Sequence, residues 1–108
     1  GAYKLPPKLD FSRIQAIASA VDVPLVLHGG SGLTDDDFRK AVSLGISKVN
    51  IFTDINVAAA RAAAKASAEA DKGITEMIPF VVDAVKQETM KKMTLFGCNG
   101  KAGVPERV

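Results

Sequence analysis

The sequence contains no tryptophan, and only one tyrosine, one cysteine and one histidine occur among its 108 residues. Because Cys98 is the single cysteine, no disulfide can form within the chain. A lone thiol without a signal peptide is typical of a reducing compartment, so we expect a cytoplasmic protein. No apolar run approaches the roughly 20 residues of a membrane-spanning helix, which predicts no contact with a membrane.

An excess of charge of either sign is also missing. The chain carries 14 basic and 12 acidic residues, a formal net charge of +2, and neither sign forms a block. Nucleic-acid surfaces usually combine a basic stripe with interleaved aromatic side chains, and this sequence has neither feature. We therefore expect no nucleic-acid partner. Hydrophobic residues make up 47% of the chain, which is enough to form a folded core.

Hydrophobic periodicity predicts the order helix, strand, helix, strand, helix, helix. The predicted helices cover about 11–21, 35–44, 53–70 and 77–92, the strands cover 25–27 and 46–51, and 94–108 is expected to be a loosely ordered tail. The strands are short, apolar and non-alternating, a pattern typical of strands covered on both faces in a parallel sheet.

Capping residues mark the ends of the predicted helices. Asp10 is a predicted N-cap, and Thr34 with Asp37 forms an acidic variant of the capping box. Thr53 or Asp54 is expected to cap the third helix. Pro79 is compatible with the last helix only if it lies in the first turn.

A strand, a helix and a second strand joined by short loops form a right-handed βαβ unit. Such units build either an open doubly wound sheet or a (β/α)8 barrel. A pair of parallel strands leaves the sheet edges unpaired, and a complete barrel needs about 250 residues. We therefore expect the chain to be a piece of a larger fold, and the absence of a methionine before Gly1 favours missing upstream sequence.

Polar residues and glycines follow both predicted strands directly, at the sheet edge where α/β proteins bind ligands. His28 and the glycine loop 29–32 follow the first strand, and Asn50 and Thr53 follow the second. Glycines let backbone N–H groups approach an anion, and the next helix N-terminus adds its positive dipole end. The two loops therefore favour a phosphate site, while a tight turn and a plain helix cap explain the same residues. Nucleotide motifs of the type G-x-x-x-x-G-K-[ST] or G-x-G-x-x-G are missing.

His28 is open to two interpretations, a hydrogen-bonded core histidine or a functional imidazole. A catalytic zinc site needs at least three protein ligands. The chain has no second histidine, and Cys98 lies in the predicted tail. Any metal site at His28 must therefore be completed by residues from outside this sequence.

The segment PLVLHGGSGLTDDDFRKAVSLGISKVNIFTD resembles the C-terminal part of the class II, metal-dependent ketose-bisphosphate aldolases, which act on fructose or tagatose bisphosphate. The combination of LHGGSG with a following KVNIFTD is more specific than either half alone. The opening GAYKLPPKLDF and the closing MKKMTLFGCNGKA are similar to further parts of this family, so the resemblance covers essentially the whole chain.

The resemblance implies a TIM (β/α)8 barrel, in which residues 1–108 form the C-terminal part of a single domain. They would supply the last two β/α units and a C-terminal helical extension. The implied metal ligand, for zinc or another divalent metal, is His28, and the implied substrate- and phosphate-binding residues are Gly1, Gly29, Ser31, Asn50 and Thr53. Gly1 is also implied to lie at a monovalent-cation site.

The implied function is metal-dependent aldol cleavage or condensation of a ketose bisphosphate, with dihydroxyacetone phosphate and an aldehyde as products, in a homodimer or homotetramer. The proton-transferring residues and the other zinc ligands would all precede Gly1, so no catalytic residue is assigned here and the 108-residue chain alone is expected to be inactive. Phe52 stands where many fructose-specific members have an acidic residue, which leaves the sugar preference open.

Two alternatives remain beside this hypothesis. A metal-independent TIM-barrel isomerase or synthase would use the same phosphate loops, with His28 as an acid–base group. A catalytically inactive fragment would bind phosphate esters without any lyase activity.

Overall fold

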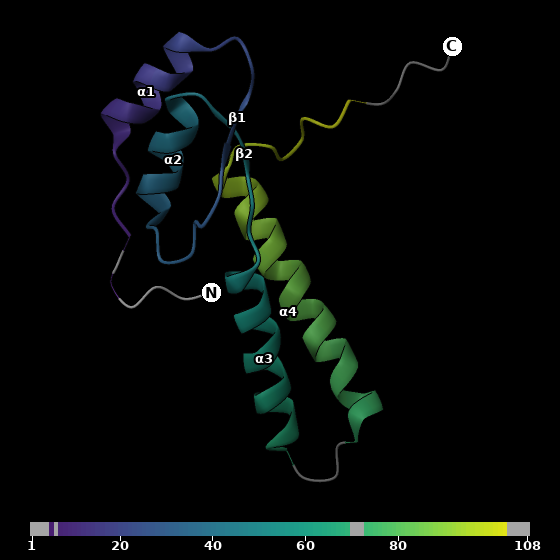
Figure 1. Cartoon of the computed structure of the whole chain (residues 1–108). Coiled ribbons are helices and arrows are strands. Elements are labelled where there is room, and N and C mark those ends of the chain that lie inside the picture. Colours follow the sequence, from purple (N-terminus) through teal and green to yellow (C-terminus); the bar gives the residue numbers. More distant parts are fainter. Residues whose placement is uncertain (1–4, 6, 70–72, 104–108) are drawn as a thin grey trace.

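The computed structural model describes residues 5, 7–69 and 73–103. Over these residues the elements follow in the order α1 (Phe11–Ala20), β1 (Leu25–Leu27), α2 (Asp35–Ser43), β2 (Ile46–Val49), α3 (Thr53–Ser67) and α4 (Ile74–Leu95) (Figure 1). The order and type of these elements confirm the prediction from periodicity. Residues 70–72, which include the predicted end of the third helix, and the last five residues of the predicted tail, 104–108, lie outside the described residues.

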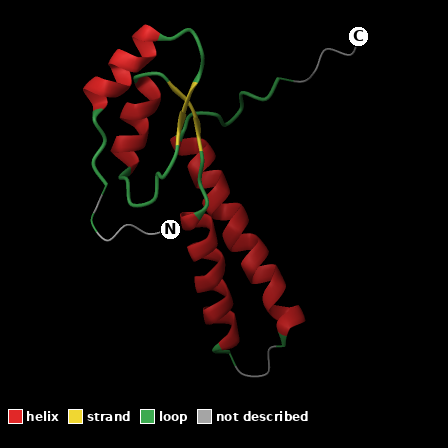
Figure 2. Cartoon of the chain, in the orientation of Figure 1, coloured by secondary structure: helices red, strands yellow, loops and turns green. Residues whose placement is uncertain are grey.

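The two strands form a parallel sheet, with Leu25 opposite Ile46 and Leu27 opposite Val49. α2 connects them, and α1 and α2 lie side by side next to the sheet (Figure 2). α3 and α4 pack along each other as a long helical hairpin that extends away from the sheet (Figure 1). Two β/α units are therefore present in this chain, as the sequence predicts.

Side-chain caps begin α1 and α2 where the sequence predicts them. Asp10 accepts a hydrogen bond of 2.9 Å from the backbone N–H of Arg13. Thr34 and Asp37 form the reciprocal capping box. At the other end of α2, Gly45 has a φ of 114°, a left-handed conformation that glycine adopts without strain.

Several predicted boundaries differ from the structure. β2 was expected to reach Ile51 but ends at Val49, because β1 is only three residues long and its last residue, Leu27, lies opposite Val49. α3 ends at Ser67, before the predicted residue 70. α4 extends to Leu95, so the predicted tail begins in a helix.

The expectation for Pro79 was wrong. α4 begins at Ile74, which places Pro79 in the second helical turn. Proline removes the N–H that would bond the carbonyl four residues earlier, that of Thr75. The helix nevertheless continues, because α4 packs against α3 along this stretch and tertiary packing outweighs the loss of one hydrogen bond.

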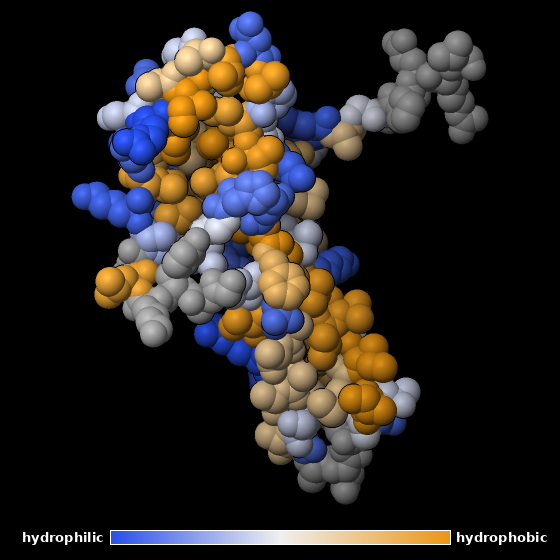
Figure 3. Space-filling model, viewed as in Figure 1, coloured by the Kyte–Doolittle hydropathy of each residue, from blue (hydrophilic) through white to orange (hydrophobic). Residues whose placement is uncertain are grey.

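The buried core is small and lies between α2, the sheet and α4. Phe38 is fully buried, and its ring packs against Phe96 with the ring centres 5.2 Å apart. The predicted cover on both faces of β1 is missing within the described residues, since Val26 is 42% exposed. Hydrophobic residues also lie on the surface along α4 (Figure 3), where Ile74 and Val82 are exposed. A radius of gyration of 17.7 Å exceeds the roughly 13 Å of a compact domain of this length.

Gly30 provides a test of the core packing. A Cβ atom at this position would lie 3.0 Å from Cε1 and 3.1 Å from Cζ of the buried Phe38 ring. We expect Gly30→Ala to lower the free energy of unfolding of the full-length protein by about 1–3 kcal/mol, because the added methyl group would displace the buried Phe38 ring, which already packs against Phe96. Gly103→Ala is the matched control, because nothing lies within 4 Å of its added methyl group. Equal thermal midpoints in the two variants would contradict this packing.

The capping box of Thr34 and Asp37 is expected to make a contribution to stability that depends on pH. The backbone N–H and the hydroxyl of Thr34 lie 3.0 and 2.8 Å from Oδ2 of Asp37. These bonds hold the pKa of Asp37 below its ordinary value. Thr34→Ala removes the hydroxyl and should cost about 1 kcal/mol of stability near neutral pH.

The same substitution should matter less in acid. A lowered folded-state pKa stabilises the protein above the ordinary aspartate pKa, and this stabilisation is lost as the pH falls through the lowered value. The difference in unfolding free energy between the parent and Thr34→Ala should therefore become smaller in acid, as measured by denaturant unfolding of the full-length protein. Thr75→Ala, at an exposed position in the first turn of α4, is the control. If the difference in unfolding free energy between the parent and Thr34→Ala does not change with pH, the Asp37 carboxylate does not contribute to the stability of this cap.

Candidate functional site

Parallel pairing brings the residues after the two strands together. The strands end at Leu27 and Val49, and the backbone N–H of Asn50 still donates to the carbonyl of Leu27 over 3.0 Å. This extension of the ladder places Asn50 beside His28, with Nδ2 of the amide 3.0 Å from Nδ1 of the imidazole. The predicted convergence of His28 and Asn50 at one sheet edge is confirmed.

The glycine loop after β1 runs close to the protein interior. Gly29 has a φ of 67°, which an L-residue with a side chain rarely adopts, and this turns the chain sharply after His28. Gly30 is buried against the ring of Phe38. The loop closes with a hydrogen bond of 3.3 Å from the N–H of Leu33 to the carbonyl of Gly30. The fold thus needs glycine at these positions and leaves little side-chain bulk at the strand end.

The N-terminus of α3 lies opposite this loop, and it differs from the sequence prediction. Thr53 and Asp54 were expected to cap the helix, but the N-cap residue is Phe52, and no side chain among the described residues caps this end. The first N–H groups of a helix have no intrahelical acceptor. The N–H groups at the start of α3 therefore remain available at the positive end of the helix dipole, which favours an anion.

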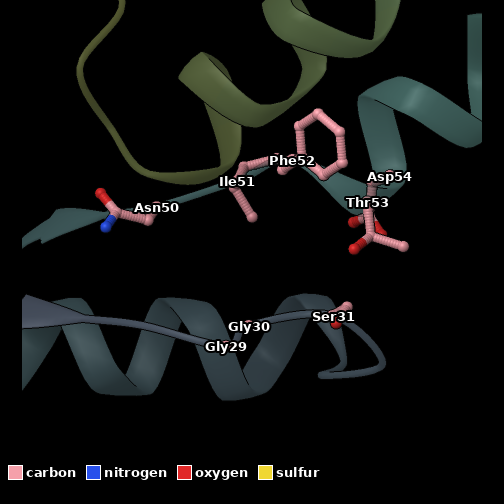
Figure 4. A pocket seen from close by; sticks show the side chains of 8 residues that line it. All are labelled: Gly29, Gly30, Ser31, Asn50, Ile51, Phe52, Thr53 and Asp54. Atoms are coloured by element: carbon pink, nitrogen blue, oxygen red, sulfur yellow. The ribbon is translucent and has the colours of Figure 1, made fainter. Parts of the chain in front are cut away.

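The two loops enclose a cleft of about 240 Å³ (Figure 4). Its lining residues are Gly29, Gly30, Ser31, Asn50, Ile51, Phe52, Thr53 and Asp54. The close-up shows Ser31 on one loop facing the beginning of α3, where Thr53 lies. Four of the predicted binding residues thus line one cavity, and the fifth, Gly1, lies outside the described residues.

Phe52 and Asp54 line the cleft without having been predicted to bind a ligand. Phe52 is 74% exposed, so its ring covers no core and is placed at the edge of the site. Asp54 contributes a carboxylate beside N–H groups that are suited to an anion. From the sequence, Asp54 was expected only as a possible helix cap, and nothing in the local pattern distinguishes a cap from a residue that lines the cleft.

The chemistry of His28 fits a metal ligand. When a histidine binds a metal through one ring nitrogen, the other usually donates its proton to an oxygen acceptor. In the structure Nδ2 of the Asn50 amide faces Nδ1 of His28. Rotation of the amide group would bring its oxygen to the same place, and Nδ1 would then carry the proton while Nε2 could bind a metal. Within residues 5, 7–69 and 73–103, no group of three His, Cys, Asp or Glu side chains comes together to complete such a site.

One residue behind the cleft was missed by the sequence analysis. Lys92 of α4 is buried, and its Nζ lies 2.5 Å from Oδ2 of Asp54. A signal for it existed, because Lys92 falls at helical spacing from Val81 and Val85, on the apolar face of α4. A lysine in a hydrophobic stripe needs a buried partner, but the sequence does not show which acid supplies it.

The part of the chain that the structure describes contains no helix long and apolar enough to cross a membrane.

Comparison with known proteins agrees with this arrangement. A model of the family "Fructose-bisphosphate aldolase class-II" matches residues 1–101. A relative in Escherichia coli (strain K12), described as the uncharacterized protein YdjI, is 42% identical over 102 residues, which are 94% of this chain and 36% of YdjI.

A solved structure gives the same result in three dimensions. The crystal structure of the YdjI aldolase from Escherichia coli K12 aligns with 90% of this chain at 41% identity and a TM-score of 0.84. The aligned region is 37% of that chain, so the present chain spans about a third of the length of the relatives it matches. From the family match over residues 1–101 and the overall similarity to YdjI in sequence and fold, this chain belongs to the class-II fructose-bisphosphate aldolase family.

Proposed function

We propose that this chain supplies a metal ligand and the phosphate-binding loops of a class II aldolase. The reaction is the reversible aldol cleavage of a phosphorylated ketose, in our proposal a ketose bisphosphate, to dihydroxyacetone phosphate and an aldehyde. The observation that carries the proposal is the uncapped start of α3 facing the glycine loop across one cleft, in a chain of this family.

The phosphate of the substrate would lie between the two loops. N–H groups at the start of α3 and around Gly29 donate to its oxygens, as do the hydroxyls of Ser31 and Thr53. Asn50 lies between this cleft and His28, so its amide is placed to bond the substrate near the reacting carbons. Binding at the phosphate holds the carbonyl in a fixed position, and binding energy is thereby used for orientation.

His28 would hold the metal together with ligands from outside this chain. When bound, a divalent metal such as zinc supplies Lewis-acid polarisation of the substrate carbonyl. The residues of this chain contribute the position: the sheet fixes His28, and the side chain of Asn50, 3.0 Å from Nδ1, fixes the orientation of the ring. The proton-transferring residues are proposed to lie before Gly1, together with the rest of a TIM barrel of which this chain forms the last two β/α units.

The exposed apolar surfaces support this larger assembly. Val26 of β1 and much of α1 face outward, and such surfaces in a folded protein are normally covered by other elements. We propose that the remaining barrel strands pair with β1 and β2 and cover them. A homodimer or homotetramer, a monovalent cation near Gly1 and a cytoplasmic location remain part of the proposal, and Phe52 leaves the choice between fructose and tagatose bisphosphate open.

The role of the metal is tested with His28→Ala in the full-length protein. We expect the variant to lose bound zinc, measured by mass spectrometry of the purified protein, and to lose aldol cleavage of fructose and tagatose bisphosphate. Chelation should likewise inactivate the parent, and added zinc should restore it. Lys86→Ala, on the exposed side of α4, is the control. Full metal content and turnover in His28→Ala would contradict the proposal, and activity after exhaustive chelation would favour the metal-independent alternative.

The phosphate loop is tested with Thr53→Val, which keeps the shape of the side chain and removes its hydroxyl. Loss of one hydrogen bond to a charged group should raise KM by roughly tenfold, with a smaller effect on kcat. Thr53→Ser retains the hydroxyl and should remain close to the parent. Calorimetric titration with inorganic phosphate should show the same loss of affinity. Equal affinities in parent and Thr53→Val would exclude this hydroxyl from the phosphate site.

A further inference from the structure

Among the charged side chains that the structure describes, Lys92 is the one that is buried, with 8% of its surface exposed. Its Nζ lies 2.5 Å from Oδ2 of Asp54 and 3.6 Å from Oε1 of Glu88. Burial of an ammonium group is costly unless it is paired, so the carboxylates of Asp54 and Glu88 are what allows Lys92 to be buried.

The position of this cluster connects both loops of the cleft. Asp54 is the second residue of α3 and lines the cleft beside Thr53 (Figure 4). The Nζ of Lys92 also lies 5.5 Å from the centre of the Phe38 ring, within the range of a cation–π contact. The Phe38 ring also packs against Gly30 of the glycine loop. The ammonium group of Lys92 therefore contacts one residue behind the glycine loop, Phe38, and one residue at the start of α3, Asp54.

The carboxylate of Asp54 presents an electrostatic problem for a phosphate site. A negative side chain in the first turn of a helix is itself attracted to the N–H groups and the positive dipole end. A free carboxylate at Asp54 would compete with a phosphate for these groups and would repel it across a short distance. Pairing with Lys92 neutralises this charge and holds the carboxylate on the α4 side of the helix start.

We propose that Lys92 is a positioning residue of the phosphate site, and that it acts through Asp54. It removes the repulsion by the Asp54 carboxylate and keeps the start of α3 open for an anion. This inference rests on the proposed function, since it assumes that the cleft binds the phosphate of the substrate. It adds a residue of the C-terminal helix that does not line the cleft to the set that determines phosphate affinity.

The alternative is that the ion pair serves stability alone. Removing one partner of a buried ion pair is strongly destabilising, so a lower thermal midpoint in a Lys92 variant would not distinguish the two roles. Phosphate affinity, measured on the folded fraction, does distinguish them. A purely structural lysine would leave this affinity and KM unchanged once the protein is folded.

The experiment uses the full-length protein and calorimetric titration with inorganic phosphate. Lys92→Met removes the charge and retains the length of the side chain, and we expect the affinity for phosphate to fall about tenfold. KM for the phosphorylated substrate should rise to a similar extent, with kcat and zinc content less affected. Lys91→Met, at the neighbouring exposed position of α4, is the matched control and should bind phosphate as the parent does.

The action through Asp54 is tested by the double variant Lys92→Met with Asp54→Asn. Removal of both charges should return the affinity to within about threefold of the parent, because the repelling carboxylate is gone. A double variant as weak as Lys92→Met would overturn the inference, as would equal affinities in Lys92→Met and Lys91→Met. If Lys92→Met does not fold, Asp54→Asn alone decides: it should bind phosphate at least as tightly as the parent, and a tenfold loss would overturn the inference.

The failure of this inference can be separated from failure of the proposed function. If the parent binds phosphate and Thr53→Val weakens it, while Lys92→Met has no effect, only the role of Lys92 is wrong. If the parent does not bind phosphate at all, the cleft is not the phosphate site and the proposed function itself fails.

Discussion

The candidate site depends on the parallel pairing of β1 with β2. Parallel strands bring their carboxyl ends to the same edge, and the bond from the N–H of Asn50 to the carbonyl of Leu27 continues the pairing past β2. This bond sets His28 and Asn50 side by side, and it brings the glycine loop opposite the start of α3. An antiparallel arrangement of the same strands would place the two loops at opposite edges of the sheet, and no cleft would form between them.

The helical hairpin contributes to this site from behind. α4 returns along α3 and places Phe96 and Lys92 against Phe38. The core of the chain and the support of the cleft are therefore largely the same residues. This arrangement fixes the distance between the loops with few side chains, which is consistent with the small number of buried residues in the described part of the chain.

Much of this could be predicted from the sequence where the signal is local. The caps at Asp10 and Thr34 depend on residues three positions away, and β1 follows from a short apolar run, so these predictions hold. The contacts of Lys92 depend on how α4 packs against elements far earlier in the chain, which periodicity does not determine. Pro79 shows the same limit, because packing along α3 outweighs a local rule. At Phe52 the local pattern was misleading, since a nearby threonine and aspartate suggested a cap that the helix does not use.

The missing cap of α3 has a thermodynamic consequence for the whole fold. A side-chain cap typically contributes about 1 kcal/mol to a helix, and α3 begins without one. An anion bound at this end would take the place of the cap, so binding and folding become linked equilibria. A ligand present at a hundredfold excess over its Kd adds about 2.7 kcal/mol to the stability of the state that binds it. Occupancy of the cleft by an anion would thus be coupled to the order of α3 and, through the ion pair of Lys92 with Asp54, to the end of α4.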